Sequence, residues 1–338
     1  MTRAGAPDRL SRMVEPDVSA VGGVAEVSES RAASHSPVVG KASVIVGLDG
    51  REHDADALAL GRFLQAALGG GLLLAHVIPP GPPGQGRLAL ESLERRDGQE
   101  LLAKSAERLG SASIETQLVE PCPAAPGLSR LAVERGASML VLGSSHRGAV
   151  GRIVPGGVAS HLLAHAPCAI AVAPVGYATR AQTSISRIGV AYDATTESDL
   201  ALAAAAAAAA TLGVPIHLYH AMHEISKDPA WDKFRGHIEE FAQGILDTGI
   251  RQLRPGVEVT GGVLEGDVAD VIAQAATSDD VALLYVGSRG YGPLREALFG
   301  GVAGALLQTA HCPLVIVPRS SRSAVDHSRR IAHAHARA

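Results

Sequence analysis

The feature that most constrains the fold is an internal repeat with a constant offset of 144 residues. Asp49 in "VIVGLDG" matches Asp193 in "IGVAYDA", and His76 in "LLLAHV" matches His220 in "IHLYHA". The glycines repeat at the same offset: Gly143, Gly148, Gly156 and Gly157 match Gly287, Gly292, Gly300 and Gly301. A period of this length indicates a duplicated domain, because solenoid repeats are only about 20–50 residues long.

Each copy alternates short apolar runs with longer helical stretches. We expect strands at 43–48, 72–78, 113–119, 138–144 and 169–174, with helices near 54–68, 88–109, 125–136 and 157–165. In the second copy we expect strands at 187–192, 215–221, 257–264, 282–288 and 313–318, with helices near 196–212, 231–252, 267–278 and 301–309. This alternation predicts an α/β fold with two open, doubly wound, mainly parallel five-stranded sheets that carry helices on both faces.

The duplicated segments set the expected domain boundaries. We predict a flexible N-terminal tail over 1–40, which is rich in Ser, Ala and Gly, a first domain over 41–178, a linker over 179–184 and a second domain over 185–319. Residues 320–338 form a basic tail with several Arg and three His. Two readings of this last segment remain open, a solvated disordered end and a contact for an acidic partner or lipid surface.

Composition excludes several classes of function. The net charge of -4 disfavours a nucleic-acid partner, because nucleic-acid-binding domains usually carry a basic stripe. The three cysteines form no C-x-x-C pair, which indicates neither a disulfide framework nor a zinc site and favours a reducing compartment. The N-terminus lacks the apolar stretch of a signal peptide, and no run of 18 apolar residues indicates membrane insertion. We therefore expect a cytoplasmic protein.

The carboxyl ends of parallel strands are where ligands of such sheets bind, and three features of each copy fall there. The first is Asp49 or Asp193, which either accepts hydrogen bonds from a ribose or an adenine amine, or caps the following helix. The second is Val77 or Ala221, which either flanks a flat base or simply packs in the core. His76 and His220 lie on predicted buried strands and are interpreted as hydrogen-bonded core histidines.

The third feature is a glycine-rich loop between a strand and a helix. In the second copy it reads "GSRGYGPLREALFGGV", from Gly287 to Val302. It is not a P-loop, because no Lys-Ser or Lys-Thr pair closes it. Glycine amides can approach a phosphate without a Cβ in the way, and the helix start at Gly300 and Gly301 adds a positive end. The same order occurs at Gly156 and Gly157, although turns also use glycine.

These motifs resemble the universal stress protein family in a tandem two-domain form. The resemblance rests on "GLD" and "AYD", on "GSSHRGAVGRIVPGGVASHLLAHAPCAIAVAP", and on "GSRGYGPLREALFGGV" followed by "HCPLVIVP". It implies a Rossmann-like fold of the adenine nucleotide alpha hydrolase type and a nucleotide motif of Gly, two residues, Gly, nine residues, Gly and Ser or Thr. Carried over by position, the implied site of the second copy comprises Asp193, Ala221, Gly287, Gly290, Gly292, Gly300 and Gly301. That of the first comprises Asp49, Val77, Gly143, His146, Gly148, Gly156 and Gly157.

The chain departs from this motif at three positions. Gly157 and Gly301 stand where the family has Ser or Thr, and His146 stands in place of the second motif glycine. Loss of a hydroxyl bond to a charged phosphate costs roughly 1.5–3 kcal/mol, so the cradle is weakened. Arg289, like His146, either meets the phosphates or lies on a solvated loop face.

The resemblance implies a stress-response regulator that binds ATP or a related adenine nucleotide, with or without Mg²⁺, and the second domain matches the motif better. The alternative is a nucleotide-free scaffold in which the final strands join the two domains as a pseudo-dimer and two chains form a homodimer. No catalytic motif is recognisable, so an enzyme, at most a weak ATPase, is the least supported reading. The signalling partner is not indicated by the sequence.

Overall fold

The computed structural model describes residues 43–84, 86–110, 114–145, 150–153, 156–164, 166–180, 185–225, 228–253, 256–288 and 301–319. The first repeat contains five strands and four α-helices, which alternate along the chain. They are β1 (Ser43–Leu48), α1 (Asp54–Leu68), β2 (Gly71–Val77), α2 (Arg87–Arg108), β3 (Glu115–Val119), α3 (Ala124–Glu134), β4 (Met139–Gly143), α4 (Gly157–Ala164) and β5 (Ala169–Ala173).

The second repeat follows the same order. Its elements are β6 (Arg187–Ala191), α5 (Thr196–Leu212), β7 (Ile216–Met222), α6 (Asp232–Gln252), β8 (Val259–Glu265), α7 (Val268–Ser278), β9 (Val281–Ser288), α8 (Val302–Thr309) and β10 (Leu314–Pro318). Short 3-10 helices at Tyr177–Thr179 and Pro229–Trp231 lie between these elements. Every strand and α-helix expected from the sequence is present among the described residues, with ends shifted by at most three residues.

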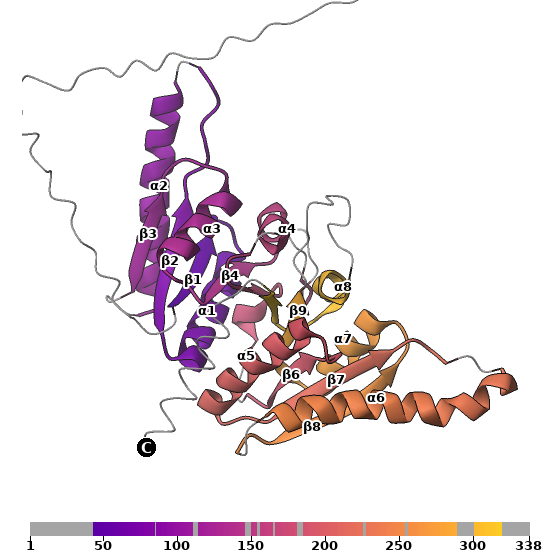
Figure 1. The fold of residues 1–338 in the computed structure, drawn as a ribbon. Helices are drawn as coiled ribbons and strands as arrows, with labels where there is room; N and C mark the ends of the chain where they lie inside the picture. The colour runs from indigo at the N-terminus through magenta and orange to yellow at the C-terminus, as the bar shows by residue number, and fades with distance from the viewer. Residues whose placement is uncertain are drawn as a thin grey trace, which may run out of the picture. The chain divides into compact units, whose positions relative to one another are not determined.

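The ten strands form one sheet in the order β3-β2-β1-β4-β5-β10-β9-β6-β7-β8. Within each repeat all neighbouring strands are parallel. The repeats meet where β5 and β10 pair antiparallel, with Val315 opposite Ala171. The two five-stranded sheets expected from the sequence are therefore joined edge to edge through their final strands, as the scaffold alternative anticipated for that contact (Figure 1).

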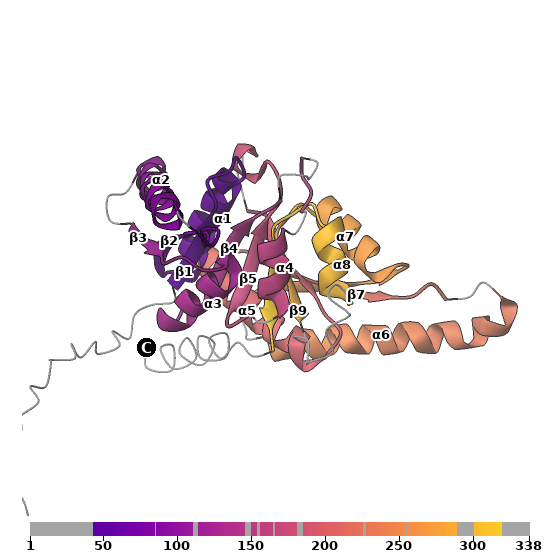
Figure 2. The same cartoon turned by 90° about the horizontal axis from the view of Figure 1, so that it is seen from above.

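Helices cover both faces of the sheet (Figure 2), and each face has its own apolar core. Buried side chains of α1, α2, α5 and α6 form one cluster, and those of α3, α4, α7 and α8 form the other. The alanine-rich α5 buries Ala201, Ala205 and Ala208, and it also contacts α1 of the first repeat. Small side chains allow this close approach of a helix to a sheet and to a second helix.

A buried carboxylate secures the end of the first repeat. Asp56 on α1 is 4% exposed and accepts hydrogen bonds from the amides of Gly176 and Ala178, each at 2.8 Å. At the same position the second repeat has Leu200, so this contact is not duplicated.

In the part of the chain that the structure describes, no helix combines the length and the apolar character that a membrane crossing requires.

Candidate functional site

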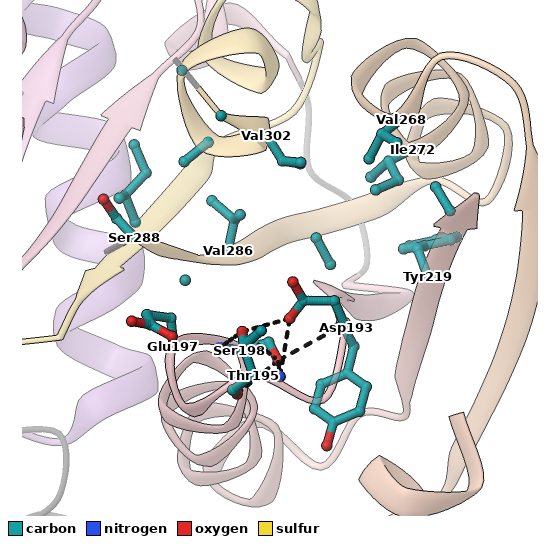
Figure 3. A pocket seen from close by; sticks show the side chains of 18 of the residues that line it. Asp193, Thr195, Glu197, Ser198, Tyr219, Val268, Ile272, Val286, Ser288 and Val302 are labelled. Carbon is teal, nitrogen blue, oxygen red and sulfur yellow. Dashed lines mark hydrogen bonds between the residues drawn. The ribbon is translucent and has the colours of Figure 1, made fainter. Parts of the chain in front are cut away.

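A pocket opens at the carboxyl ends of the parallel strands in each repeat. The first pocket, of about 560 Å³, lies between the ends of β1, β2 and β4 and the start of α4. The second, of about 420 Å³, lies between the ends of β6, β7 and β9 and the start of α8 (Figure 3). Both volumes are in the range of pockets that hold a small organic ligand.

All nine sequence-predicted site residues that the structure describes line these pockets. They are Asp49, Val77, Gly143, Gly156 and Gly157 in the first repeat and Asp193, Ala221, Gly287 and Gly301 in the second. The other six lie outside the described residues: His146, Gly148, Arg289, Gly290, Gly292 and Gly300. Residues 144 apart thus gather in two equivalent places.

The aspartate at the end of the first strand of each repeat shapes a tight loop. Oδ1 of Asp49 accepts the amide of Arg51 at 3.1 Å, and Oδ1 of Asp193 accepts the amide of Thr195 at 3.1 Å. The residues at the helix N-caps are instead His53 and Thr195. The helix-cap alternative for both aspartates is therefore wrong. The hydroxyl of Thr195 also donates to Oδ1 of Asp193, and Nε of Arg51 lies 3.5 Å from Oδ2 of Asp49.

A histidine fixes each strand end just before this aspartate. Nδ1 of His76 lies 2.9 Å from the carbonyl oxygen of Leu48, and Nδ1 of His220 lies 2.9 Å from that of Tyr192. The hydrogen bond expected for these histidines is present, but their expected place in the core is wrong, because both are half-buried and line a pocket.

The first glycine of each loop is required by packing. A Cβ on Gly143 would lie 2.7 Å from the carbonyl oxygen of His53, and one on Gly287 would lie 2.3 Å from that of Glu197. These carbonyls belong to the backbone at the start of α1 and α5, which cannot move aside as a flexible side chain can. This packing role cannot be predicted from the sequence motif, which indicates only a phosphate cradle, because the helix approaches the glycine only in three dimensions.

The two glycines that stand in place of Ser or Thr differ in conformation. A Cβ on Gly157 would meet nothing within 4 Å. Gly301 is the N-cap of α8 and has φ 106°, a region that side chains other than hydrogen strain. A side chain with a hydroxyl would therefore be strained at position 301 in this backbone conformation, whereas position 157 has room for one.

A buried acid distinguishes the first pocket. Asp54 on α1 is 8% exposed and accepts the amides of Asp49 at 3.1 Å and Gly50 at 2.8 Å. Burial raises the pKa of its carboxyl to about 6, although these hydrogen bonds act in the opposite direction. The second repeat has the neutral Ser198 here, whose Oγ accepts the amide of Thr195 at 3.0 Å. Sequence reasoning missed both residues, which the offset of 144 would have paired.

The neighbouring position also differs in charge. Glu197 lines the second pocket beside Gly287, is 7% exposed, and has Oε1 3.6 Å from Nη1 of Arg319 (Figure 3). In the first repeat His53 takes this place, with Nδ1 3.8 Å from Oδ2 of Asp56. The wall beside the loop thus carries a carboxylate in the second repeat and an imidazole in the first.

The remaining wall of the second pocket is apolar. Val268 and Ile272 of α7 face it, together with Tyr219 of β7, whose hydroxyl donates to Oδ2 of Asp279 at 2.7 Å. Such a wall suits a flat, weakly polar group, with the polar residues confined to the opposite side (Figure 3).

Neither a metal nor a reactive thiol is indicated by the described residues. Among them, no group of three or more His, Cys, Asp or Glu side chains is placed to hold a metal ion. Cys168 and Cys312 are buried, and desolvation raises the pKa of each thiol to about 12. Both are small core residues, and a thiol without thiolate character is a poor nucleophile.

Comparisons with known proteins by family model, by sequence and by structure agree on one family. The model of the universal stress protein family matches residues 42–174 and again 184–318. The chain is 29% identical over 296 residues to the universal stress protein Rv2005c of Mycobacterium tuberculosis, covering 82% of this chain and 97% of that protein. The structure resembles a universal stress protein from Archaeoglobus fulgidus, with a TM-score of 0.58 at 18% identity over 82% of this chain and 96% of that one. The chain therefore belongs to the universal stress protein family and carries two copies of the family's domain in tandem.

Proposed function

We propose that the chain is a stress-response regulator that binds ATP or a related adenine nucleotide in its two pockets. The observation that carries this proposal is the coincidence of three ligand-binding elements in each pocket. An acceptor, Asp49 or Asp193, lies beside an apolar wall, and a helix starts with glycine at the opposite end. The acceptor suits a ribose or an adenine amine, and the amides of a helix start suit a phosphate.

The orientation of the ligand follows from these positions. The base would lie against Ala221, Val268 and Ile272 in the second pocket, with the phosphates toward Gly301 and Val302. The motif match favours the second repeat as the stronger site, as the sequence analysis proposed. Glu197 opposes a polyphosphate at that end, whereas its ion pair with Arg319 reduces this repulsion.

The direct test has two arms. Protein purified from its expression host is heat-denatured, and released adenine nucleotide is identified by mass spectrometry. Calorimetry with ATP, in the presence and absence of Mg²⁺, then compares the unmodified chain with Asp193→Asn and Asp49→Asn. Loss of a hydrogen bond to a charged group is expected to weaken ATP binding about 10- to 100-fold at the altered site.

Asp97→Asn is the matched control, because Asp97 is an exposed residue of α2 away from both pockets. No released nucleotide together with no binding of millimolar ATP would refute the proposal. An equal loss in Asp97→Asn would show that the effect is not local to the site.

A nucleotide-free scaffold is the second candidate, and the conformation of Gly301 favours it. A positive φ at the N-cap disfavours the Ser or Thr that the family motif places there. The edge-to-edge sheet formed by β5 and β10 would then be the functional feature. Co-purified nucleotide would count against this candidate.

A further inference from the structure

The loop after the first strand of each repeat differs in charge at three matched positions that line the pockets. These positions hold Arg51, His53 and Asp54 in the first repeat and Thr195, Glu197 and Ser198 in the second. The first pocket thus has a guanidinium and an imidazole beside its acid, whereas the second has an acid beside two neutral hydroxyls. Among the described residues that line the second pocket there is no Lys or Arg. The second pocket is therefore the more negative of the two.

The carboxylates of the first pocket are accompanied by positive or N–H groups. Nε of Arg51 lies 3.5 Å from Oδ2 of Asp49. The buried Asp54 accepts the amides of Asp49 at 3.1 Å and of Gly50 at 2.8 Å. His53 adds an imidazole, which is either neutral or positively charged. An anionic ligand therefore meets little uncompensated negative charge at this loop.

Glu197 lies at the end of the second pocket where the proposed nucleotide would carry its phosphates. A Cβ on Gly287 would lie 2.8 Å from Cβ of Glu197, so the acid starts beside the end of β9. In the sheet, β6 separates β9 from β7, whose end carries Ala221 on the proposed base side. Figure 3 shows Glu197 across the pocket from Val268 and Ile272 of the apolar wall. A polyphosphate that extends away from this wall runs toward the carboxylate.

His53 takes the corresponding place in the first pocket, because a Cβ on Gly143 would lie 3.5 Å from Cβ of His53. The side chains of His53 and Glu197 are only 14% and 10% exposed. Charges that are largely removed from water are screened less than exposed ones. Arg319 lies 3.6 Å from Glu197, but its side chain is 66% exposed, so it compensates the acid only in part.

We propose that His53 and Glu197 determine how many phosphate groups each pocket accepts. The first pocket takes a polyphosphate adenine nucleotide, and the second takes an adenine nucleoside or a nucleotide with one phosphate group. This inference rests on the function proposed above and adds the class of ligand for each pocket. The motif match of the second repeat concerns its glycines, whereas selection by charge depends on the side chain next to them.

Calorimetry with adenosine, AMP and ATP tests the assignment, because these ligands share the base and the ribose and differ in their phosphates. A chelator is present, so that no Mg²⁺ neutralises the phosphates. Asp193→Asn weakens the second pocket and reports on the first, and Asp49→Asn reports on the second. In Asp193→Asn we expect ATP to bind at least as tightly as adenosine. In Asp49→Asn we expect ATP to bind about 10-fold or more weakly than adenosine.

Two charge variants test the residues themselves. In the Asp49→Asn background, Glu197→Gln should strengthen ATP binding about 10-fold and change adenosine binding by less than about 2-fold, because it removes a charge and keeps the shape. In the Asp193→Asn background, His53→Glu should weaken ATP binding about 10-fold. The matched control is Glu258→Gln in the Asp49→Asn background, which should leave both ligands unaffected. Glu258 is exposed and precedes β8, at the opposite end of the strands from the pocket.

Circular dichroism and thermal unfolding check that each variant is folded, and Glu197→Gln decides the question if His53→Glu fails to fold. No binding of any of the three ligands at either pocket would refute the proposed function itself, and selection by charge with it. The same order of ligands in Asp193→Asn and Asp49→Asn would overturn selection by charge alone. An equal gain for ATP and adenosine in Glu197→Gln would also overturn it, as would an equal gain for ATP in Glu258→Gln.

Discussion

In the first repeat the buried carboxylate of Asp54 holds the loop that follows β1, whereas in the second repeat the hydroxyl of Ser198 holds the loop that follows β6. The backbone around the two pockets is otherwise arranged alike, with an aspartate, a histidine and a glycine 144 residues apart in equivalent places. One backbone geometry can thus be maintained by an ionisable group or by a neutral one. At this position the first repeat therefore has a buried ionisable group, whose pKa is raised to about 6, and the second repeat has a neutral one.

The largest expected effect concerns the first glycine of the glycine-rich loop, which packs against the start of a helix in both repeats. Gly287→Ala would place a Cβ 2.3 Å from the carbonyl oxygen of Glu197, a backbone atom. We expect a loss of about 3 kcal/mol or more in the free energy of unfolding, measured by urea denaturation. Gly143→Ala should cost somewhat less, because the corresponding approach is 2.7 Å.

Gly156→Ala serves as the control for this comparison, since its Cβ would meet only Ser145 Cβ, at 4.0 Å. If Gly287→Ala were no more destabilising than Gly156→Ala, the contact between the strand end and the helix start would not constrain these positions.

The next largest expected effect is a pH dependence of stability that arises from Asp54 in the first repeat. Asp54 binds its proton more tightly in the folded chain, where its pKa is about 6, than at its ordinary pKa of 3.8. Its contribution to stability is therefore fully present below about pH 4 and is lost as the pH rises through about 6. The two values differ by about 2 pKa units, which corresponds to roughly 3 kcal/mol.

Asp54→Ser, which installs the residue of the second repeat, should flatten this part of the stability profile. Urea denaturation at pH 4, 5, 6 and 7 measures the difference from the unmodified chain. Ser198→Asp should introduce a similar dependence into the second repeat. Parallel profiles for Asp54→Ser and the unmodified chain would show that Asp54 does not titrate in this range.

The smallest effect tests the missing hydroxyls. Gly157→Ser should leave stability within about 0.5 kcal/mol, because a Cβ there meets nothing within 4 Å. If the first pocket binds ATP, the added hydroxyl should strengthen binding about 10-fold by calorimetry. Gly301→Ser should instead cost about 1–2 kcal/mol of stability, since φ at Gly301 is 106°. Equal stability changes in the two variants would contradict the conformational difference between the repeats.

Much of the fold and part of the site could be predicted from the sequence. The order of strands and helices follows from local apolar patterns, and the constant offset located both pockets through Asp49 and Asp193. The role of Gly143 and Gly287 could not be predicted, because it depends on the approach of a helix that is distant in the sequence. The charge difference between His53 and Glu197 is visible in the sequence, but its position beside the loop is not.

By itself the sequence determined the duplication, the alternation of strands and helices, and the strand ends at which the candidate site residues gather. These properties depend on side-chain periodicity and on chain order, which are local. Only the tertiary structure decided that the two sheets join through β5 and β10, and that Asp54 is buried with a raised pKa. These properties depend on which surfaces approach each other in space and on how much water each approach removes.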